Sequence, residues 1–262
     1  MEEKKPHENV RAVERALEIL LAFRPGDKEL SVAELLTRVD LSRPTLYRLL
    51  NTLEQNGFLV SSGEPQRFRL GSSVAQLAHA WMANNTIAQL AQPMLRELWE
   101  ATSETVALFV PEGTYRICVA ELESPQPLSF RRGVGYREKL VLGASGRTIL
   151  SHMPLSTDDL RRYLTDPNQD VTALVADLDA VRARGFGTSH HELIAGAVAV
   201  AAPFFNGANQ VAGSVSIFGP SVRVTEERVA HFAELLKQQV AKLSRALGHQ
   251  GDAGPTHGGA RR

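Results

Sequence analysis

The chain has 262 residues, of which 43% are apolar and 22% are charged, and its basic and acidic side chains balance to a formal net charge of zero. This length allows two domains of ordinary size, and the composition is that of a soluble globular protein. The neutral balance excludes a general attraction to nucleic acid, so any such attraction must come from a local patch, and the single cysteine, Cys118, excludes an internal disulfide and a multi-cysteine zinc site.

The first part of the chain predicts one compact domain over residues 9–71, after a polar segment 1–8 that we expect to be mobile. This segment lacks the apolar core of a signal peptide. Ser31 and Glu34 have the spacing of a capping box, which starts a helix. In chain order, the pattern predicts a helix over 9–23, a helix over 31–36, a helix over 43–56 that Ser42 caps and Gly57 ends, and a β-hairpin over 58–70.

The helix over 43–56 has an apolar face for the core and an opposite polar face. Recognition helices contact DNA with their N-terminal half, where arginine pairs best with guanine and asparagine with adenine. The alternative is a generic pair of capped helices with a solvated face, but the order of helix, turn, helix and basic hairpin favours a winged helix-turn-helix domain. The residues that we expect to contact DNA are Ser42, Arg43, Pro44, Thr45, Tyr47, Arg48 and Asn51, with Arg67 and Arg69 on the hairpin.

A helical stretch over 72–102 follows, and we expect it to link two domains, with breaks near Asn84-Asn85 and Pro93. One face of its first half is apolar and suits the pairing of two chains into a symmetric dimer. That face consists of Val74, Leu77, Ala78, Trp81 and Met82.

The remainder predicts a second, mixed α and β domain over 103–247, followed by a Gly-rich tail over 248–262 that we expect to be disordered. We interpret Cys118 as a buried, inert thiol rather than a redox group. No apolar run reaches the roughly 18 residues that span a bilayer, so we expect a cytoplasmic protein without a membrane partner. The pattern predicts strands over 105–110, 115–122, 127–132, 198–204 and 211–218, and helices over 146–152, 157–164, 172–184 and 226–247.

Catalysis and metal binding are both weakly supported. A hydrolase with Ser145 as nucleophile is one alternative, but the segment 143–147 lacks the last glycine of a nucleophile elbow and no general base can be assigned. His190-His191-Glu192 does not predict a metal site, because adjacent strand residues point to opposite faces. A DNA-architectural protein without an effector would leave the second domain unexplained. We therefore expect no enzyme, no metal and no cofactor.

An ordered set of motifs over residues 10 to 245 resembles the IclR family of bacterial regulators. No single motif is specific, but the set and its order are. The motifs are RAVERALEIL at 11–20, RPTLYRLL at 43–50, FRLG at 68–71, LVLGASGRTIL at 140–150, RGF at 184–186, Gly196, AAP at 201–203 and SIFGP at 216–220.

The resemblance implies an α+β protein with a winged helix-turn-helix, a linker helix and an effector domain whose curved antiparallel sheet is flanked by helices. It also implies a homodimer, or a dimer of dimers, on palindromic double-stranded promoter DNA. The family contains repressors and activators, and we expect this chain to regulate a catabolic operon in response to a small molecule.

By the same analogy, the effector is an organic acid whose carboxylate meets the start of the helix after Gly143, where N–H groups and the helix dipole favour an anion. The residues alone favour an ordinary capped helix with a tight turn, and only the resemblance favours the anion site. Ser189, Ala199 and Phe218 stand where relatives often have an acidic residue, cysteine and serine. These three residues make the pocket more apolar, and a polar ligand group that is buried there without a partner costs about 1–3 kcal/mol. We therefore expect a bulkier, partly apolar acid, such as an aromatic one. The expected effector residues are Leu142, Gly143, Ala144, Ser145, Gly146, Ser189, Ala199, Ser216 and Phe218.

Overall fold

The computed structural model describes residues 10–24, 26–83, 86–166 and 170–250, and the chain divides into two compact units, 1–84 and 85–262. Each unit has its own hydrophobic core. The segment 1–8 that we expected to be mobile, the predicted break at Asn84-Asn85 and residues 251–262 of the predicted tail lie outside the described residues. Residues 248–250 of that tail are ordered, contrary to expectation: the His249 N–H donates to the Ser244 carbonyl at 2.9 Å.

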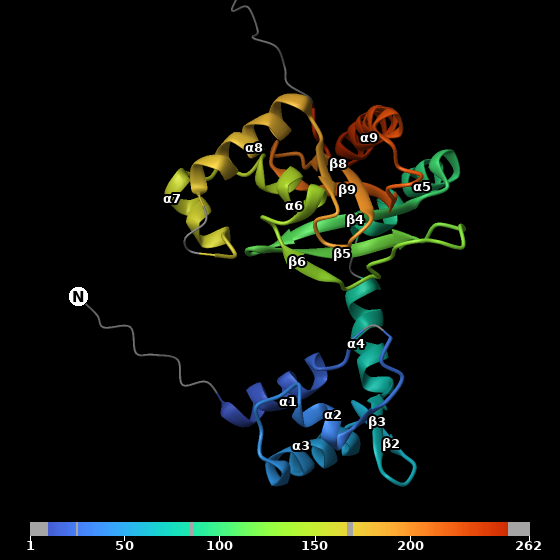
Figure 1. The fold of residues 1–262 in the computed structure, drawn as a ribbon, viewed down its shortest axis with the longest axis vertical. Helices are drawn as coiled ribbons and strands as arrows, with labels where there is room; N and C mark the ends of the chain where they lie inside the picture. The colour runs from blue at the N-terminus through green and yellow to red at the C-terminus, as the bar shows by residue number, and fades with distance from the viewer. Residues whose placement is uncertain (1–9, 25, 84–85, 167–169, 251–262) are drawn as a thin grey trace, which may run out of the picture. The chain divides into compact units, whose positions relative to one another are not determined.

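The first unit is a winged helix-turn-helix domain, as predicted (Figure 1). Its antiparallel sheet has the strand order β1-β3-β2, in which β1 is a two-residue strand that the sequence did not predict. In chain order its elements are α1 (Arg11–Leu21), β1 (Leu30–Ser31), α2 (Val32–Leu36), α3 (Arg43–Gln55), β2 (Leu59–Ser62), β3 (Arg67–Leu70) and α4 (Ser72–Ala83).

Local signals position α2 and α3 in this unit. The capping box is confirmed, because the Glu34 N–H donates to Ser31 Oγ at 3.2 Å and the Ser31 N–H donates to Glu34 Oε2 at 2.7 Å. The predicted side-chain cap by Ser42 is wrong: its hydroxyl lies 2.9 Å from Thr45 Oγ1 and accepts no backbone N–H. After α3, Gly57 has a φ of +71°, the left-handed conformation expected after a helix.

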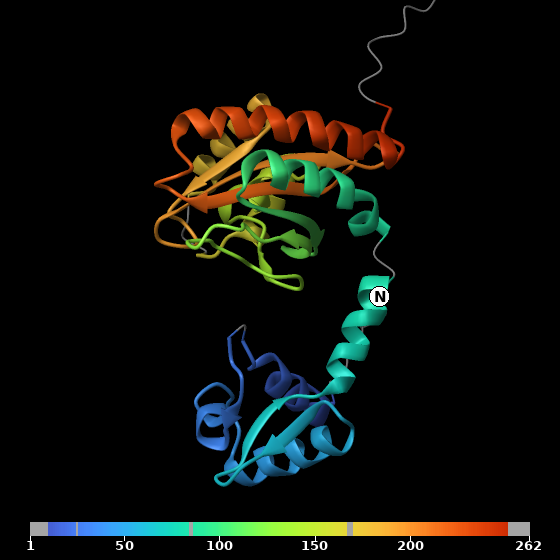
Figure 2. The ribbon, with the colours of Figure 1, turned by 90° about the vertical axis from the view of Figure 1, so that its right-hand side faces the viewer.

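The second unit has one six-stranded antiparallel sheet in the order β6-β5-β4-β9-β8-β7. Figure 2 shows the helices over 86–102 and 226–246 lying beside each other against it. In chain order its elements are α5 (Thr86–Thr102), β4 (Thr105–Glu112), β5 (Tyr115–Leu122), β6 (Arg137–Lys139), α6 (Gly143–Leu150), α7 (Thr157–Leu160), η1 (Arg161–Tyr163), α8 (Val171–Arg184), β7 (Gly187–His190), β8 (Ala197–Phe205), β9 (Val211–Pro220) and α9 (Glu226–Ala246).

Helices cover both faces of this sheet, and strand alternation separates two cores. In β4, Val106 and Leu108 pack into the core beneath α5 and α9. Ala107 and Phe109 point to the other face and pack into the core beneath α6 and α8. Helix α6 packs against β7, β8 and β9, and Phe218 lies on β9.

Two expectations about this unit are wrong. Residues 127–132 form no strand, whereas 137–139 and 187–190 form the two edge strands. Helix α5 continues through Pro93, and its Ala91, Leu95 and Leu98 are buried in the core of the second unit. The stretch 86–102 is therefore part of the second unit rather than a free linker. Within the described residues, no helix is long and apolar enough to cross a membrane.

Candidate functional site

Helix α3 turns its polar residues away from the core that contains Leu46, Leu50 and Leu53. Neither Arg43 nor Arg48 forms an ion pair or side-chain hydrogen bond with the described residues, so both guanidinium groups are available to a partner. Of the predicted DNA-contacting residues on α3 and its cap, Ser42, Arg43, Pro44, Tyr47, Arg48 and Asn51 are exposed and Thr45 is half-buried.

The two arginines of the hairpin differ in their surroundings. They flank Phe68, which is buried in the core of the unit. Arg69 is exposed and has no ion-pair partner among the described residues, whereas Arg67 Nη2 donates to Glu34 Oε2 at 3.1 Å and to the Glu29 carbonyl at 3.3 Å. Arg67 therefore ties β3 to α2 and to Glu29, the residue before β1. On β3, only Arg69 has a positive charge without a partner among the described residues.

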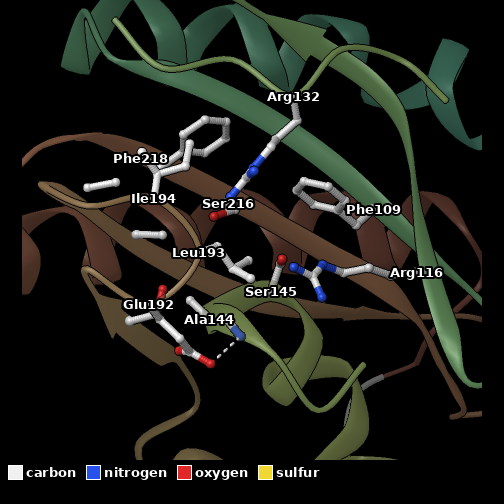
Figure 3. A pocket seen from close by; sticks show the side chains of 14 residues that line it. Phe109, Arg116, Arg132, Ala144, Ser145, Glu192, Leu193, Ile194, Ser216 and Phe218 are labelled. Carbon is white, nitrogen blue, oxygen red and sulfur yellow. Dashed lines mark hydrogen bonds between the residues drawn. The ribbon is translucent and has the colours of Figure 1, made fainter. Parts of the chain in front are cut away.

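In the second unit, a cavity of about 40 Å³ lies between α6, the sheet and the segment 191–196 (Figure 3). Leu142 and Gly146, two of the expected effector residues, do not line it. The expected residues that do line it are Gly143, Ala144, Ser145, Ser189, Ala199, Ser216 and Phe218. Sequence reasoning missed the others, which are Phe109, Arg116, Arg132, Glu192, Leu193, Ile194 and Ala197.

The start of α6 offers backbone donors to this cavity. Gly143 has a φ of +69°, which glycine adopts without the strain of a side chain. Its N–H donates to Glu192 Oε1 at 2.9 Å. The N–H groups of Ala144 and Ser145 donate to none of the described residues, although both residues are buried. The positive end of the α6 dipole and two unpaired donors therefore point to the same place.

Glu192 belongs to the segment that closes the cavity on one side. Its carboxylate forms ion pairs with Arg147 at 2.7 Å, and Arg147 also pairs with Asp177 at 2.9 Å. Burial raises the pKa of Glu192, but the hydrogen bonds from Arg147 and Gly143 outweigh this and hold its pKa below the usual value. Glu192 is therefore ionised at neutral pH, and it shares the Arg147 guanidinium with Asp177.

Arg116 is the most unusual lining residue, because its side chain is only 2% exposed. Nη1 donates to the carbonyl oxygens of Lys139 at 2.7 Å and Leu142 at 2.8 Å, and Nε has no hydrogen-bond partner among the described residues. Burial lowers the pKa of Arg116 to about 10, so the guanidinium remains protonated at neutral pH. The signal that could have revealed it is strand alternation, since Arg116 shares the inward face of β5 with Cys118.

The charged lining changes the sequence-based view of the pocket. The expected apolar residues Ala199 and Phe218 do line the cavity, but Arg116, Arg132 and Glu192 add charges that the sequence did not predict. An engineered cavity that binds benzene measures about 150 Å³, so the roughly 40 Å³ present here is too small for an aromatic acid without rearrangement. The structure therefore favours a small acid over the aromatic one that we expected.

The other candidate groups have ordinary surroundings. Cys118 is buried, as expected, and burial raises the pKa of its thiol to about 12. His191 Nδ1 accepts the Gly196 N–H at 3.0 Å, whereas His190 lies 3.9 Å from Glu226. No histidine hydrogen-bonds to Ser145 in the described part of the chain, and those residues contain no cluster of side chains suited to a metal ion.

Comparison with known proteins identifies the family. Residues 12–63 match the family model of the IclR helix-turn-helix domain, and residues 79–245 match that of the bacterial transcriptional regulator IclR C-terminal domain. The chain belongs to the IclR family. The predicted resemblance and the fold class are thus confirmed, and the protein is a DNA-binding transcriptional regulator.

Relatives along the whole chain agree with this assignment. The HTH-type transcriptional regulator BhcR of Paracoccus denitrificans is 30% identical over 257 residues, which cover 94% of this chain and 90% of BhcR. The HTH-type transcriptional repressor AllR of Escherichia coli is 25% identical over 246 residues, or 90% of each chain. The crystal structure of an IclR transcriptional regulator from Alicyclobacillus acidocaldarius matches with a TM-score of 0.75 and 28% identity, covering 92% of this chain and 99% of that one. These relatives are regulators rather than enzymes, which supports our prediction that Ser145 is not a nucleophile.

Proposed function

We propose that this regulator binds a palindromic promoter site of a catabolic operon as a homodimer or dimer of dimers, in the cytoplasm, and that a small organic acid changes its affinity for that site. The observation that carries the proposal is the N-terminal half of α3, where Arg43 and Arg48 are exposed and have no partner among the described residues. A protein surface with free cations beside polar side chains suits phosphates and base edges together.

Roles can be assigned along this surface. Arg48 and Asn51 lie one helical turn apart on the exposed face, and we assign them to base edges in the major groove. Arg43 at the helix start and Arg69 on β3 are assigned to phosphates, which position the domain without reading sequence. Arg67 is assigned to holding the hairpin, because Glu29 and Glu34 already occupy it.

Exposed apolar residues on the first unit support a dimer. Val13, Leu17 and Leu21 recur at helical spacing on α1, and Leu17 is 51% exposed. Leu77 of the expected pairing face on α4 is also exposed, whereas the side chains of Trp81 and Met82 lie outside the described residues. A two-fold interface would cover these groups and give two recognition helices for two half-sites.

The cavity beside α6 supports the sensing of an acid. The free N–H groups of Ala144 and Ser145 suit one carboxylate, and the neighbouring positive charge of Arg116 strengthens the site. An acid that binds the two DNA-binding states with different affinity shifts their balance, and only that difference changes operator affinity.

Selection of duplexes from a random library by the purified full-length chain tests the proposal. We expect enrichment of an inverted repeat whose two halves are protected equally in footprinting. Enrichment of a single unrepeated half-site would overturn the symmetric dimer. No enrichment over the starting library would contradict sequence-specific binding itself.

A further inference from the structure

The cavity beside α6 contains a buried positive charge without a negative partner. The Arg116 guanidinium donates only through Nη1, to two carbonyl oxygens, while Nε and Nη2 donate to none of the described residues. No carboxylate among the described residues forms an ion pair with the Arg116 guanidinium. Because a buried charge is costly unless it is paired, this arrangement calls for an anion.

The glycines of α6 bring Arg116 against the helix start. A Cβ on Gly146 would lie 2.5 Å from Arg116 Nη1, and a Cβ on Gly143 would lie 3.3 Å from Nη2. Figure 3 shows the guanidinium directed at Ser145. Arg116 and the N–H groups of Ala144 and Ser145 can therefore hold the same carboxylate.

A second cation lies across the cavity. Arg132 reaches into it from the segment before β6, and Figure 3 shows its side chain directed at Ser216. Its guanidinium stacks over the Tyr136 ring at 4.7 Å and forms no ion pair within the described part of the chain. Glu192 also lines the cavity and its charge acts on Arg116, but its carboxylate accepts hydrogen bonds from Arg147 and the Gly143 N–H. Among the described residues, neither arginine of the cavity has a carboxylate in ion-pair contact. Two cations and a helix start thus face one small space.

We propose that the effector is a short aliphatic dicarboxylate, with one carboxylate on the α6 start and Arg116 and the other on Arg132. This inference rests on the proposed function that an organic acid binds the cavity. A monocarboxylate would leave Arg132 without a partner, and the small volume of about 40 Å³ favours a short chain over a long or aromatic one. Arg132 is the residue that selects for the second charge.

Calorimetry on the full-length protein tests this with malonate, succinate and glutarate against propionate, butyrate and valerate, with benzoate as the aromatic probe. We expect one dicarboxylate to bind at least about tenfold more tightly than its monocarboxylate of equal length, the effect of one added hydrogen-bonded charge. Arg132→Gln should abolish this ratio, because it should weaken the binding of dicarboxylates far more than that of monocarboxylates. The matched control Arg131→Gln removes the adjacent, exposed arginine, which does not line the cavity, and should keep the ratio.

Arg116→Gln should weaken dicarboxylates and monocarboxylates alike, because both use the first site. Since Arg116 is buried and that variant can fail to fold, Arg132→Gln decides the outcome. If dicarboxylates and monocarboxylates bind equally, or if benzoate binds more tightly than both, the proposal of a dicarboxylate effector is wrong, but the proposal that the protein senses an acid stands. If neither series nor benzoate binds, acid sensing and this inference both fail.

Discussion

Arg48 lies on the exposed side of α3, opposite the buried leucines. Arg48→Ala should cost operator affinity about 1–3 kcal/mol and relax the preference at one base pair, as expected for a residue that reads a base edge. Fluorescence anisotropy on the selected operator, with single base-pair changes, measures both effects. Arg15→Ala removes the same charge from an exposed position on α1 and should leave the preference unchanged. Equal loss on every duplex would reassign Arg48 to a phosphate.

Glu104 precedes β4 and is only 1% exposed. Its carboxylate accepts hydrogen bonds from Arg223 Nε at 2.7 Å and Nη2 at 2.8 Å. Glu104→Gln should lower the free energy of unfolding by about 1–3 kcal/mol, because it removes the charge that a buried carboxylate presents to the partly exposed Arg223. Urea denaturation measures this. Glu112→Gln, whose partner Arg137 is also exposed, should cost less than about 1 kcal/mol and serves as the control. Similar losses for the two variants would contradict the importance of the buried pair.

The sequence predicted which side chains of α3 are exposed, but it did not predict the buried charge of Arg116. The polar face of α3 could be assigned because hydrophobic periodicity separates it from Leu46 and Leu50. Arg116 could not, because its burial depends on the carbonyl oxygens of Lys139 and Leu142, which only the fold brings to it.

The turn between α1 and α2 has a carboxylate that stabilises the first unit. The hydrogen bond from Arg38 and that from the Arg24 N–H hold the pKa of Asp27 below its usual value. The stabilisation is fully present above the ordinary aspartate pKa of about 3.9 and is lost as the pH falls through the lower folded-state pKa. The gap in melting temperature between wild type and Asp27→Asn should therefore narrow as the pH falls below about 4.

Thermal denaturation of the full chain between neutral pH and pH of about 3 measures that gap. Asp158→Asn is the control, because its side chain is 96% exposed and pairs only at the surface with Arg161, so its gap should be small at every pH. A gap for Asp27→Asn that stays constant over the whole range would show that the folded state does not favour the ionised carboxylate.

The edge strands explain which elements escaped prediction. β6 consists of Arg137, Glu138 and Lys139, and such charged, short strands lack an apolar alternation but protect a sheet edge. Residues 127–132 look like a strand by composition, yet side chains satisfy their backbone: Thr105 donates to the Phe130 carbonyl and Arg223 to that of Leu128. Both outcomes depend on tertiary contacts rather than on local pattern.

At the scale of the whole molecule, the exposed leucines of α1 predict self-association. Leu17→Glu should convert a dimer into a monomer and weaken operator binding, because a charge in an apolar interface must be desolvated. Light scattering with size-exclusion chromatography measures the mass. Ala12→Glu adds the same charge at another exposed position of α1, on the side opposite Leu17, and should leave the dimer intact. A wild-type monomer at micromolar concentration that still binds its operator would contradict this.

Occupation of the cavity beside α6 is expected to change the affinity of the protein for DNA. The most direct measurement is operator affinity by fluorescence anisotropy, with and without saturating acid, for wild type and for Ser145→Pro, which lacks one N–H donor at the α6 start. We predict that the acid changes wild-type affinity by about 5–150-fold, the usual range of coupling between two sites, and that Ser145→Pro binds the operator normally without responding. An acid that binds wild type by calorimetry and leaves operator affinity unchanged would contradict the account.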